Sequence, residues 1–414
     1  MSKLDELIEK LCPNGVEYKT LGELGKFYGG ITGKCKEDFK DGNAKFITYK
    51  NVYENISLKL DVEDRVKISE KENQKTLEYG DIIFTGSSET PDECGLSSVI
   101  TEKVEERLYL NSFCFFFRMN NKEILNPDFA KHLFRSSNLR YQIGKTSSGV
   151  TRFNVSKKAM EKVRIPVPPL EVQCEIVHIL DNFTLLSAEL SAELKARKKQ
   201  YKFYKKDLLE DKSIDNWLEL GELFDTKNGY TPSKSNKEYW TNGDIPWFRM
   251  EDIRENGRIL DDSIQHINSK GVKGSIFPRN SIIISTSATI GEYALITKES
   301  VANQRFTFLM LKEKYKENYD IKFLFYYCSI LSEWCKNNLN QGNFASVDMK
   351  KFAKFKFPRI EIEEQRKIVS ILDRFDKLCN DISEGLPAEI EARQKQYEYY
   401  RDKLLTFKEL KVNE

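Results

Sequence analysis

Patterns that mark common classes of enzyme are missing from these 414 residues. The chain has three histidines, His132, His178 and His266, which lie far apart in the sequence, so we expect neither a histidine-based triad nor a histidine-rich metal site. A phosphate-binding loop of the GxxxxGKS/T type and a GxSxG nucleophile elbow are also absent. We therefore predict no catalytic residue and no metal site in this chain.

Closely spaced cysteines and long apolar runs are missing as well. The eight cysteines contain no CxxC pair, which argues against a zinc site and favours reduced cytoplasmic thiols. No apolar run approaches about 18 residues, the length needed to cross a membrane. The N-terminus has no charged-then-apolar signal pattern. We expect a cytoplasmic protein, in which the longest apolar-aromatic run, residues 113–117, forms a buried strand.

The composition fits a soluble protein of two or three domains with long charged helices. Hydrophobic residues make up 40% of the chain and charged residues 31%. Lys and Arg number 66 against 64 acidic residues, so the net charge is only +2. This balance excludes a uniformly basic coat, and any surface that binds nucleic acid must be local.

One stretch occurs twice, at residues 166–209 and 358–405. In both copies a proline opens a segment whose apolar residues recur at steps of three and four, which predicts a long helix with a coiled-coil stripe. A single stripe on so long a helix needs a partner, and the natural partner is the other copy. The second copy carries four extra residues and contains Gly385-Leu386-Pro387, so we expect a kink or break there. Its predicted stripe is Ile368, Ile371, Phe375, Leu378, Ile382, Leu386, Ile390, Tyr397, Tyr400 and Leu404.

The regions between the helices are also copies of each other. Short islands match, such as YKTLGEL with WLELGEL and YGDIIFTGSS with RNSIIISTSA. Both regions mix short strands, glycine-rich turns and a helical stretch, which predicts a tandem duplication of an α/β (α+β) domain. In each, a buried strand ends in a loop rich in Ser and Thr, which can hold phosphate or base edges or form an ordinary turn. The predicted division is 1–165 (first domain with a short N-terminal helix), 166–212 (central helix), 213–357 (second domain) and 358–414 (C-terminal helix, kinked near 385–387).

The order domain, helix, domain, helix resembles the specificity (S) subunit of type I restriction-modification systems. PPLEVQ or EIEEQ opens each helix, and ILDNF or ILDRF follows it. Residues 383–407 look especially close to that family's helical repeat, and GDIPWFRMEDI at 243–253 is similar to a frequent motif of its target-recognition domains. The resemblance covers residues 16–407.

This resemblance implies two target-recognition domains, each contacting one half of a split, asymmetric sequence in double-stranded DNA. It implies an antiparallel pair of helices that sets the gap and docks two methyltransferase (modification) subunits, with restriction/translocase subunits joining for cleavage. S-adenosylmethionine, ATP and Mg²⁺ would then belong to those partners, and this chain would hold no cofactor. A stand-alone structural or regulatory DNA-binding protein on the same scaffold remains the alternative.

Residue type and loop position select candidate DNA contacts, because basic, hydroxyl and amide side chains reach phosphates and base edges. In the first domain they are Lys34, Lys36, Lys50, Asn51, Thr85, Ser87, Ser88, Thr151 and Arg152. In the second they are Ser233, Lys234, Ser235, Asn236, Arg249, Ser287, Thr289, Gln304, Arg305, Gln341 and Asn343. Any one of them alone is more often a solvated loop residue. A basic run on the central helix could grip DNA, but a solvated or partner-binding face is favoured; it consists of Lys195, Arg197, Lys198, Lys199, Lys202, Lys205 and Lys206.

Overall fold

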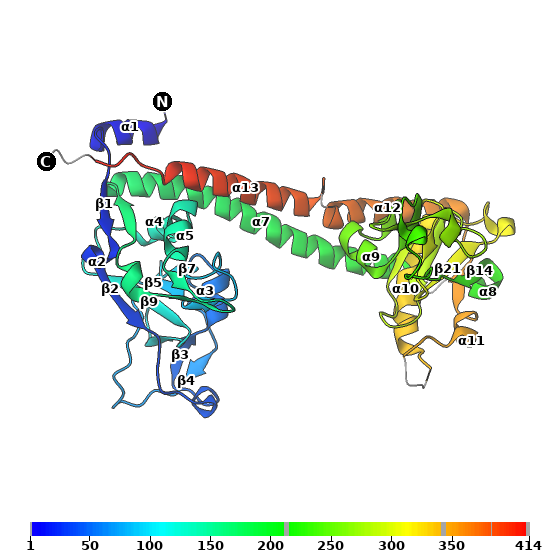
Figure 1. Cartoon of the computed structure of the whole chain (residues 1–414), viewed down its shortest axis with the longest axis horizontal. Coiled ribbons are helices and arrows are strands. Elements are labelled where there is room, and N and C mark those ends of the chain that lie inside the picture. The colour runs from blue at the N-terminus through cyan, green and yellow to red at the C-terminus, as the bar shows by residue number, and fades with distance from the viewer. Residues whose placement is uncertain (1, 211–214, 341–344, 382, 411–414) are drawn as a thin grey trace. The chain divides into compact units, whose positions relative to one another are not determined.

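The structure is a computed structural model that describes residues 2–210, 215–340, 345–381 and 383–410. The chain forms two compact units, residues 1–192 with 388–414 (unit 1) and residues 193–387 (unit 2). Each unit combines one globular α+β domain with parts of the long helices, as the labels of Figure 1 show. The predicted fold class is therefore confirmed. The four-part division at residues 165, 212 and 357 stays a prediction.

Unit 1 is built on a four-stranded sheet in the order β2-β9-β5-β7. All four residues of β5 are buried, as expected for a short apolar run inside a sheet. A smaller sheet, β4-β3-β8, lies beside it. The elements of the domain are α1 (Lys3–Leu11), β1 (Glu17–Thr20), α2 (Leu21–Leu24), β2 (Gly25–Gly29), η1 (Lys36–Phe39), β3 (Ala44–Ile47), α3 (Tyr49–Glu54), β4 (Arg65–Val66), β5 (Ile82–Thr85), β6 (Ser87–Ser88), β7 (Ser97–Val99), β8 (Leu108–Leu110), β9 (Cys114–Met119), α4 (Pro127–Leu133), α5 (Ser137–Gly144), β10 (Ser147–Ser148), β11 (Phe153–Val155), α6 (Lys157–Met160) and β12 (Arg164–Val167).

Unit 2 repeats this plan with a five-stranded sheet in the order β14-β21-β18-β19-β16. Here β18 takes the place of β5, and β21 takes that of β9. Its elements are β13 (Trp217–Glu219), α8 (Leu220–Leu223), β14 (Phe224–Asn228), η2 (Lys237–Trp240), β15 (Ile245–Phe248), α9 (Met250–Asn256), β16 (Ile259–Leu260), β17 (His266–Ile267), η3 (Ser269–Gly271), β18 (Ser281–Ser285), β19 (Tyr293–Ile296), β20 (Val301–Ala302), β21 (Phe306–Leu311), η4 (Glu313–Tyr315), α10 (Ile321–Asn337), α11 (Met349–Phe352) and β22 (Lys356–Pro358). The predicted duplication is thus present strand for strand in the core.

The first long helix is continuous and the second is broken. α7 runs over Leu170–Leu209, whereas the second copy forms α12 (Ile362–Asn380) and α13 (Leu386–Leu404). Between them a Cβ on Gly385 would lie 2.5 Å from the carbonyl oxygen of Lys377 and 2.6 Å from that of Asp381. A side chain does not fit at this close approach, which accounts for the glycine at the predicted break.

The two helix copies pack antiparallel, as the resemblance implies, so that the start of each copy lies against the end of the other. In unit 1 the first half of α7 lies alongside α13 (Figure 1). There the ring of Phe183 stacks on the ring of Tyr400. In unit 2 the second half of α7 packs against α12, with Tyr204 stacked on Phe375. Since Phe375 corresponds to Phe183 and Tyr204 to Tyr400 in the repeat, the same contact forms in both units with the roles of the copies exchanged.

Two equivalent glutamines fasten the helices to their domains. The amide group of Gln173 donates to the carbonyl oxygens of Ile124 and Pro168, and its Oε1 accepts from the backbone N–H of Asn126. Gln365 makes the same three bonds in unit 2, to Ile360, Asn318 and Asp320. Both glutamine side chains are fully buried. The glutamine shared by PPLEVQ and EIEEQ therefore satisfies backbone groups where each helix meets its domain.

The predicted stripe of the second copy was wrong at two positions. Ile371 is 40% exposed and Leu378 is 36% exposed, whereas Leu372 is fully buried. α12 packs against α10 of its own domain as well as against α7, so the buried face is rotated away from a pure coiled-coil stripe. A third stripe residue, Ile382, lies outside the described residues. Among the helices described, none is long and apolar enough to cross a membrane.

Candidate nucleic-acid interface

A cleft opens in unit 1 between α3 and the loops that follow β5 and β10. We call it the first cleft; its volume is about 580 Å³. It is lined by Tyr49, Tyr53, Ser87, Ser88, Glu89, Glu93, Phe113, Thr151 and Arg152. Four of these, Ser87, Ser88, Thr151 and Arg152, were predicted from the sequence, and the fold brings them together.

Aromatic rings, a carboxylate and a guanidinium share the first cleft. The rings of Tyr49 and Tyr53 stack with centroids 6.1 Å apart. The hydroxyl of Tyr53 donates to Glu93 at 2.8 Å, and this bond, together with those from Thr90 and Ser88, lowers the pKa of Glu93 and keeps it ionised. Arg152 donates through Nε to the hydroxyl of Ser87 at 3.0 Å, which leaves its outer nitrogens for a ligand. The cleft can therefore donate, accept and stack.

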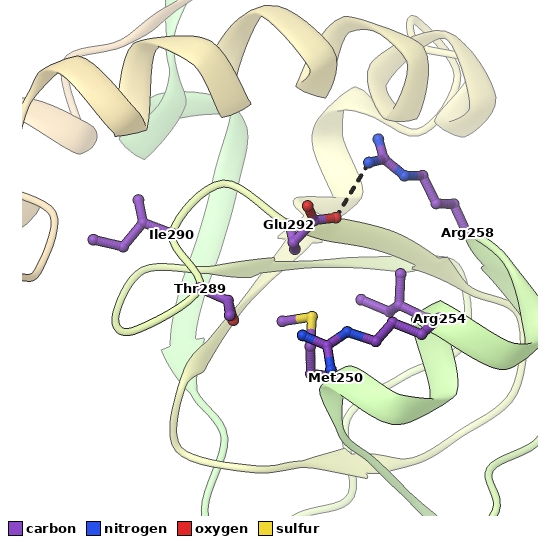
Figure 2. Close-up of a pocket in the computed structure, with 7 residues that line it drawn as sticks. Met250, Arg254, Arg258, Thr289, Ile290 and Glu292 are labelled. Atoms are coloured by element: carbon purple, nitrogen blue, oxygen red, sulfur yellow. Dashed lines mark hydrogen bonds and ion pairs between the residues drawn. The ribbon is translucent and has the colours of Figure 1, made fainter. Parts of the chain in front are cut away.

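Unit 2 carries a second cleft of about 450 Å³ between α9 and the loop that follows β18 (Figure 2). It is lined by Met250, Ile253, Arg254, Arg258, Thr289, Ile290 and Glu292. Figure 2 shows Arg258 paired with Glu292, at 3.2 Å, and Arg258 also lies over the ring of Tyr293. Arg254 is exposed and has no hydrogen-bond or ion-pair partner among the described residues. One guanidinium of this cleft is thus held in place, and the other is available.

The two clefts share two equivalent walls, the helix α3 or α9 and the loop after β5 or β18, which are built with different side chains. α3 follows β3 as α9 follows β15. Tyr49 corresponds to Met250 within the matched islands 44–52 and 245–253, and Tyr53 corresponds to Arg254 one residue past them. Glu89 and Thr289 likewise occupy matching loops after β5 and β18. A common backbone with different linings is what two domains that recognise different ligands of one class need.

Several predicted residues of the first domain brace loops instead of facing the cleft. Lys34 donates to the carbonyl oxygen of Lys67 and pairs with Glu72, and its hydrogen bond lowers the pKa of Glu72 to about 2. Asn51 bonds both backbone groups of Lys59.

Thr85 is fully buried and accepts from the backbone N–H of Leu96. Lys36 on η1 and Lys50 on α3 are exposed. Their contact with a ligand stays a prediction.

The predicted residues of the second domain are more scattered. Thr289 lines the second cleft, and its buried hydroxyl has no partner among the described residues. Ser233, Lys234, Ser235 and Asn236 form an exposed to half-buried turn in which the two serine hydroxyls bond each other and Asn236 caps η2.

Arg249 precedes α9 and lies over the ring of Trp247. Ser287 pairs through its backbone with Ser346, and Gln304 accepts from Thr231. Arg305 is exposed. Gln341 and Asn343 lie outside the described residues.

The lining residues that lie on α3, on α9 and in the turn before β9 were not selected in the sequence analysis. Tyr53 and Arg254 stand one residue past the matched islands 44–52 and 245–253, so extending the repeat would have drawn attention to them. Phe113 was assigned to a buried strand, and that prediction was wrong: β9 begins at Cys114, and Phe113 is 61% exposed. The apolar run 113–117 gave no signal that its first residue lies outside the sheet.

His132 is buried, and both of its ring nitrogens form hydrogen bonds. Nε2 lies 2.7 Å from Oδ1 of Asp181 on α7, and Nδ1 lies 2.8 Å from the hydroxyl of Tyr397 on α13. Burial lowers the pKa of His132, so it is neutral and accepts from Tyr397. It lines neither of the two clefts described above. This cluster joins α4 to both long helices.

The basic run on α7 is divided by the fold. Lys195, Lys198, Lys199, Lys202 and Lys206 are exposed. Lys205 instead lies 5.8 Å from the ring centroid of Tyr201 and 5.7 Å from that of Tyr326, and burial lowers its pKa to about 8. The run is therefore mostly a solvated face, with one lysine drawn into unit 2.

The chain matches the family described as type I restriction modification DNA specificity domain twice, over residues 13–197 and 215–392. The specificity subunit of the type I restriction enzyme EcoprrI of Escherichia coli is 56% identical over 204 residues, covering 47% of this chain and 51% of that protein. The EcoR124I/EcoR124II specificity subunit of the same species is 40% identical over 276 residues, covering 61% and 65%. The chain thus spans less than two thirds of the length of either relative.

Solved structures of similar fold agree with this match. An S subunit of the type I restriction-modification system of M. genitalium superimposes with a TM-score of 0.52 at 14% identity, covering 94% of this chain and 96% of that one. A chain from a study of complex assembly and conformational transition in a type I R-M system gives 0.65 at 17%, covering 95% and 98%. The double match over most of the sequence is decisive: the chain belongs to the family of type I restriction-modification DNA specificity domains.

Proposed function

We propose that this chain is the DNA-reading specificity subunit of a type I restriction-modification complex. Each unit reads one half of a bipartite, asymmetric sequence. The observation that carries this proposal is the pair of equivalent clefts with different linings, because one scaffold with two sets of side chains suits two different half-sites.

The linings match the chemistry of base edges. An arginine such as Arg254 can donate two hydrogen bonds to the O6 and N7 atoms of guanine, and a carboxylate such as Glu93 can accept from the amino group of cytosine. Exposed lysines such as Lys36, Lys50 and Lys234 would contact phosphates and position the domains without reading sequence. Because such contacts release counterions, binding should weaken steeply as the salt concentration rises.

Catalysis is assigned to partner subunits under this proposal. Two methyltransferase subunits would dock on the long helices, restriction/translocase subunits would join for cleavage, and S-adenosylmethionine, ATP and Mg²⁺ would bind to those partners. The complex would act on double-stranded DNA in the cytoplasm. Within the described parts of the chain, no group of three or more His, Cys, Asp or Glu side chains is arranged to hold a metal ion.

The purified full chain tests the division of labour directly. It should bind duplex DNA, with an affinity that falls as the salt concentration rises. It should transfer no methyl group from S-adenosylmethionine until methyltransferase subunits are added. Methylation by the homogeneous chain alone would contradict the proposal. A stand-alone regulator on the same scaffold would purify without a methyltransferase and would direct no methylation when one is supplied.

A domain graft tests the assignment of half-sites. Replacing residues 18–165 with the corresponding region of a relative should change one half of the methylated motif and leave the other half intact, because each domain has its own core. The readout is the methylated motif in genomic DNA of cells that express the chain with its partners. A change in both halves at once would contradict independent reading.

A further inference from the structure

We propose that Phe113 and Arg305 are specificity-determining residues at one equivalent position of the two domains. Phe113 contacts the C5-methyl group of a thymine in the first half-site, and Arg305 donates to the O6 and N7 atoms of a guanine in the second. The inference rests on the proposed function and extends it by assigning base identities to two side chains.

The backbone that presents Phe113 is a fixed turn. Its N–H donates to the side-chain oxygen of Asn111 at 2.9 Å, and its carbonyl oxygen accepts from the N–H of Gly86, in the loop after β5, at 2.8 Å. Asn111 is itself buried and donates twice to the carbonyl oxygen of Ile47, the last residue of β3. Both backbone groups of Phe113 are therefore occupied, and the turn is tied to two strands.

Arg305 lies on the same turn in unit 2. Its N–H donates to the side-chain oxygen of Asn303 at 3.0 Å, and its carbonyl oxygen accepts from the N–H of Thr286, in the loop after β18, at 3.0 Å. The N–H of Asn303 donates to the carbonyl oxygen of Phe248, the last residue of β15. Every bond thus has its counterpart in unit 1, so the two positions are structurally equivalent.

In both domains a glycine packs closely against the turn. A Cβ on Gly30 would lie 1.9 Å from the carbonyl oxygen of Asn111, and one on Gly229 would lie 2.3 Å from that of Ala302 and 2.5 Å from that of Asn303. Gly30 directly follows β2 and Gly229 directly follows β14, and the backbone there can approach the turn this closely only without a side chain. This packing holds the turn rigid, which reduces the entropy lost when its side chain orders on a ligand.

The side chains at these positions do nothing evident for the fold. Phe113 is 61% exposed, whereas the next four residues, 114–117, are buried. It lines the first cleft beside Arg152. Arg305 is exposed, and within the described ranges its guanidinium has no hydrogen-bond or ion-pair partner. The equivalent turns of the two units thus each present one large side chain to a ligand. One is an apolar ring and the other a guanidinium, as expected for contacts with different bases.

The chemistry commits each residue to one base. An apolar ring in the major groove makes its distinctive contact with the thymine methyl group, which the other three bases lack, whereas a guanidinium makes its best contact with guanine. Burying one methyl group corresponds to about fourfold in affinity. A paired arginine–guanine contact corresponds to tenfold or more.

Base analogues test these contacts in the full chain assembled with its methyltransferase subunits. The probe is a duplex that carries the motif methylated by the wild-type complex, with the halves assigned by the domain graft. Replacing each thymine of the first half-site in turn with uracil removes only the methyl group. One replacement should weaken wild-type binding about fourfold and should leave the binding of Phe113→Ala unchanged. Phe113→Leu, which keeps an apolar side chain, should retain most of the preference for thymine.

In the second half-site the analogue is 7-deazaguanine, which lacks the N7 acceptor. One replacement should weaken wild-type binding severalfold and leave the binding of Arg305→Ala unchanged. With natural bases, Arg305→Ala should relax one G·C position about tenfold or more and no position of the first half-site.

The chain supplies matched controls at the starts of β5 and β18, because it is the far ends of these strands that lead into the loops bonded to the two turns. Tyr79, before β5, and Arg279, before β18, are also equivalent in the repeat, and both are exposed. Tyr79→Ala and Arg279→Ala remove side chains of the same kind away from the turn, so they should leave the preference at every position unchanged. A uniform loss of affinity in Phe113→Ala, with unchanged preferences, would mean that the ring acts as a wedge between bases and would overturn the assignment.

The proposed function and this inference fail in different ways. If the wild-type complex selects no bipartite motif, the proposed function itself is wrong. If the motif is bipartite but the first half-site has no thymine, or the second has no G·C pair, only the inference is overturned. The same holds if the alanine variants respond to the analogues as the wild type does.

Discussion

The ring of Phe183 on α7 stacks on the ring of Tyr400 on α13, with centroids 5.3 Å apart and an interplanar angle of 18°. The equivalent pair in the other unit, Phe375 and Tyr204, lies at 5.7 Å and 29°. Each unit thus joins the start of one helix copy to the end of the other. Unit 1 combines residues 1–192 with the distant segment 388–414, whereas unit 2 is continuous over 193–387, and each unit contains parts of both helix copies.

Phe183→Ala should destabilise the helix pair of unit 1 by about 1–3 kcal/mol, since a half-buried aromatic ring loses both its burial and its stacking partner. The measurement is hydrogen exchange of the α7 and α13 amides at residues 172–190 and 390–404. The matched control is Leu185→Ala, two residues away and 59% exposed, which should change exchange by less than about 0.5 kcal/mol. Equal effects of the two variants would contradict the packing described for Phe183.

Acid should weaken unit 1 through His132. Burial holds the folded-state pKa of His132 below its ordinary value of 6.5, although the hydrogen bond that His132 donates to Asp181 opposes this shift. The unfolded chain therefore binds the proton first, and stability is lost as the pH falls from 6.5 toward the folded-state pKa, by at most about 1.4 kcal/mol per pH unit. His132→Gln removes this titration, so the stability difference between it and the wild type should depend on pH below 6.5. Exposed His178 supplies the control, because His178→Gln should follow the wild-type pH profile.

Lys205 gives a pH dependence of the same sign in unit 2, in a higher pH window. Burial, reinforced by the charge of Arg258, lowers its pKa to about 8 from 10.5. Below pH 8 Lys205 is charged in both the folded and the unfolded state, and the burial of its charge destabilises the folded state in full. Between pH 8 and 10.5 the folded state loses the proton while the unfolded state keeps it, so this destabilisation decreases as the pH rises. Lys205→Met should therefore stabilise unit 2 by about 2 kcal/mol at pH 7, and its advantage should shrink as the pH approaches 10.5. Lys202→Met on the exposed face of α7 should show no such advantage, and a Lys205→Met variant less stable than the wild type at pH 7 would contradict the assignment.

Lengthening α7 should change the gap between the half-sites. α7 is one uninterrupted helix through Leu194, and four residues add about one turn, or about 6 Å. We expect a four-residue insertion after Leu194 to keep both half-sites and to lengthen the unspecified gap by about one or two base pairs. The methylated motif of cells expressing the variant with its partners is the readout. Deleting Arg197 alone rotates the following residues by about 100° and should abolish activity, whereas an unchanged gap in the active insertion variant would show that this helix is not the spacer.

Local patterns in the sequence determined the larger plan. Matching islands such as YKTLGEL and WLELGEL established the duplication, because equivalent sequences form equivalent strands and short helices. The break at Gly385 was also readable, since helix ends depend on residues within one turn.

The tertiary structure alone decided which side chains face a ligand and which are buried. Phe113 and Phe115 belong to one apolar run, yet a turn held by Asn111 exposes the first, and the sheet buries the second. Ile371 and Leu372 are neighbours on one helix, and only packing against α10 determines that Leu372 is the buried one. The clefts and the His132–Asp181 pair join residues tens of positions apart, so no local periodicity could reveal them; they exist because strands and helices distant in sequence meet in one core.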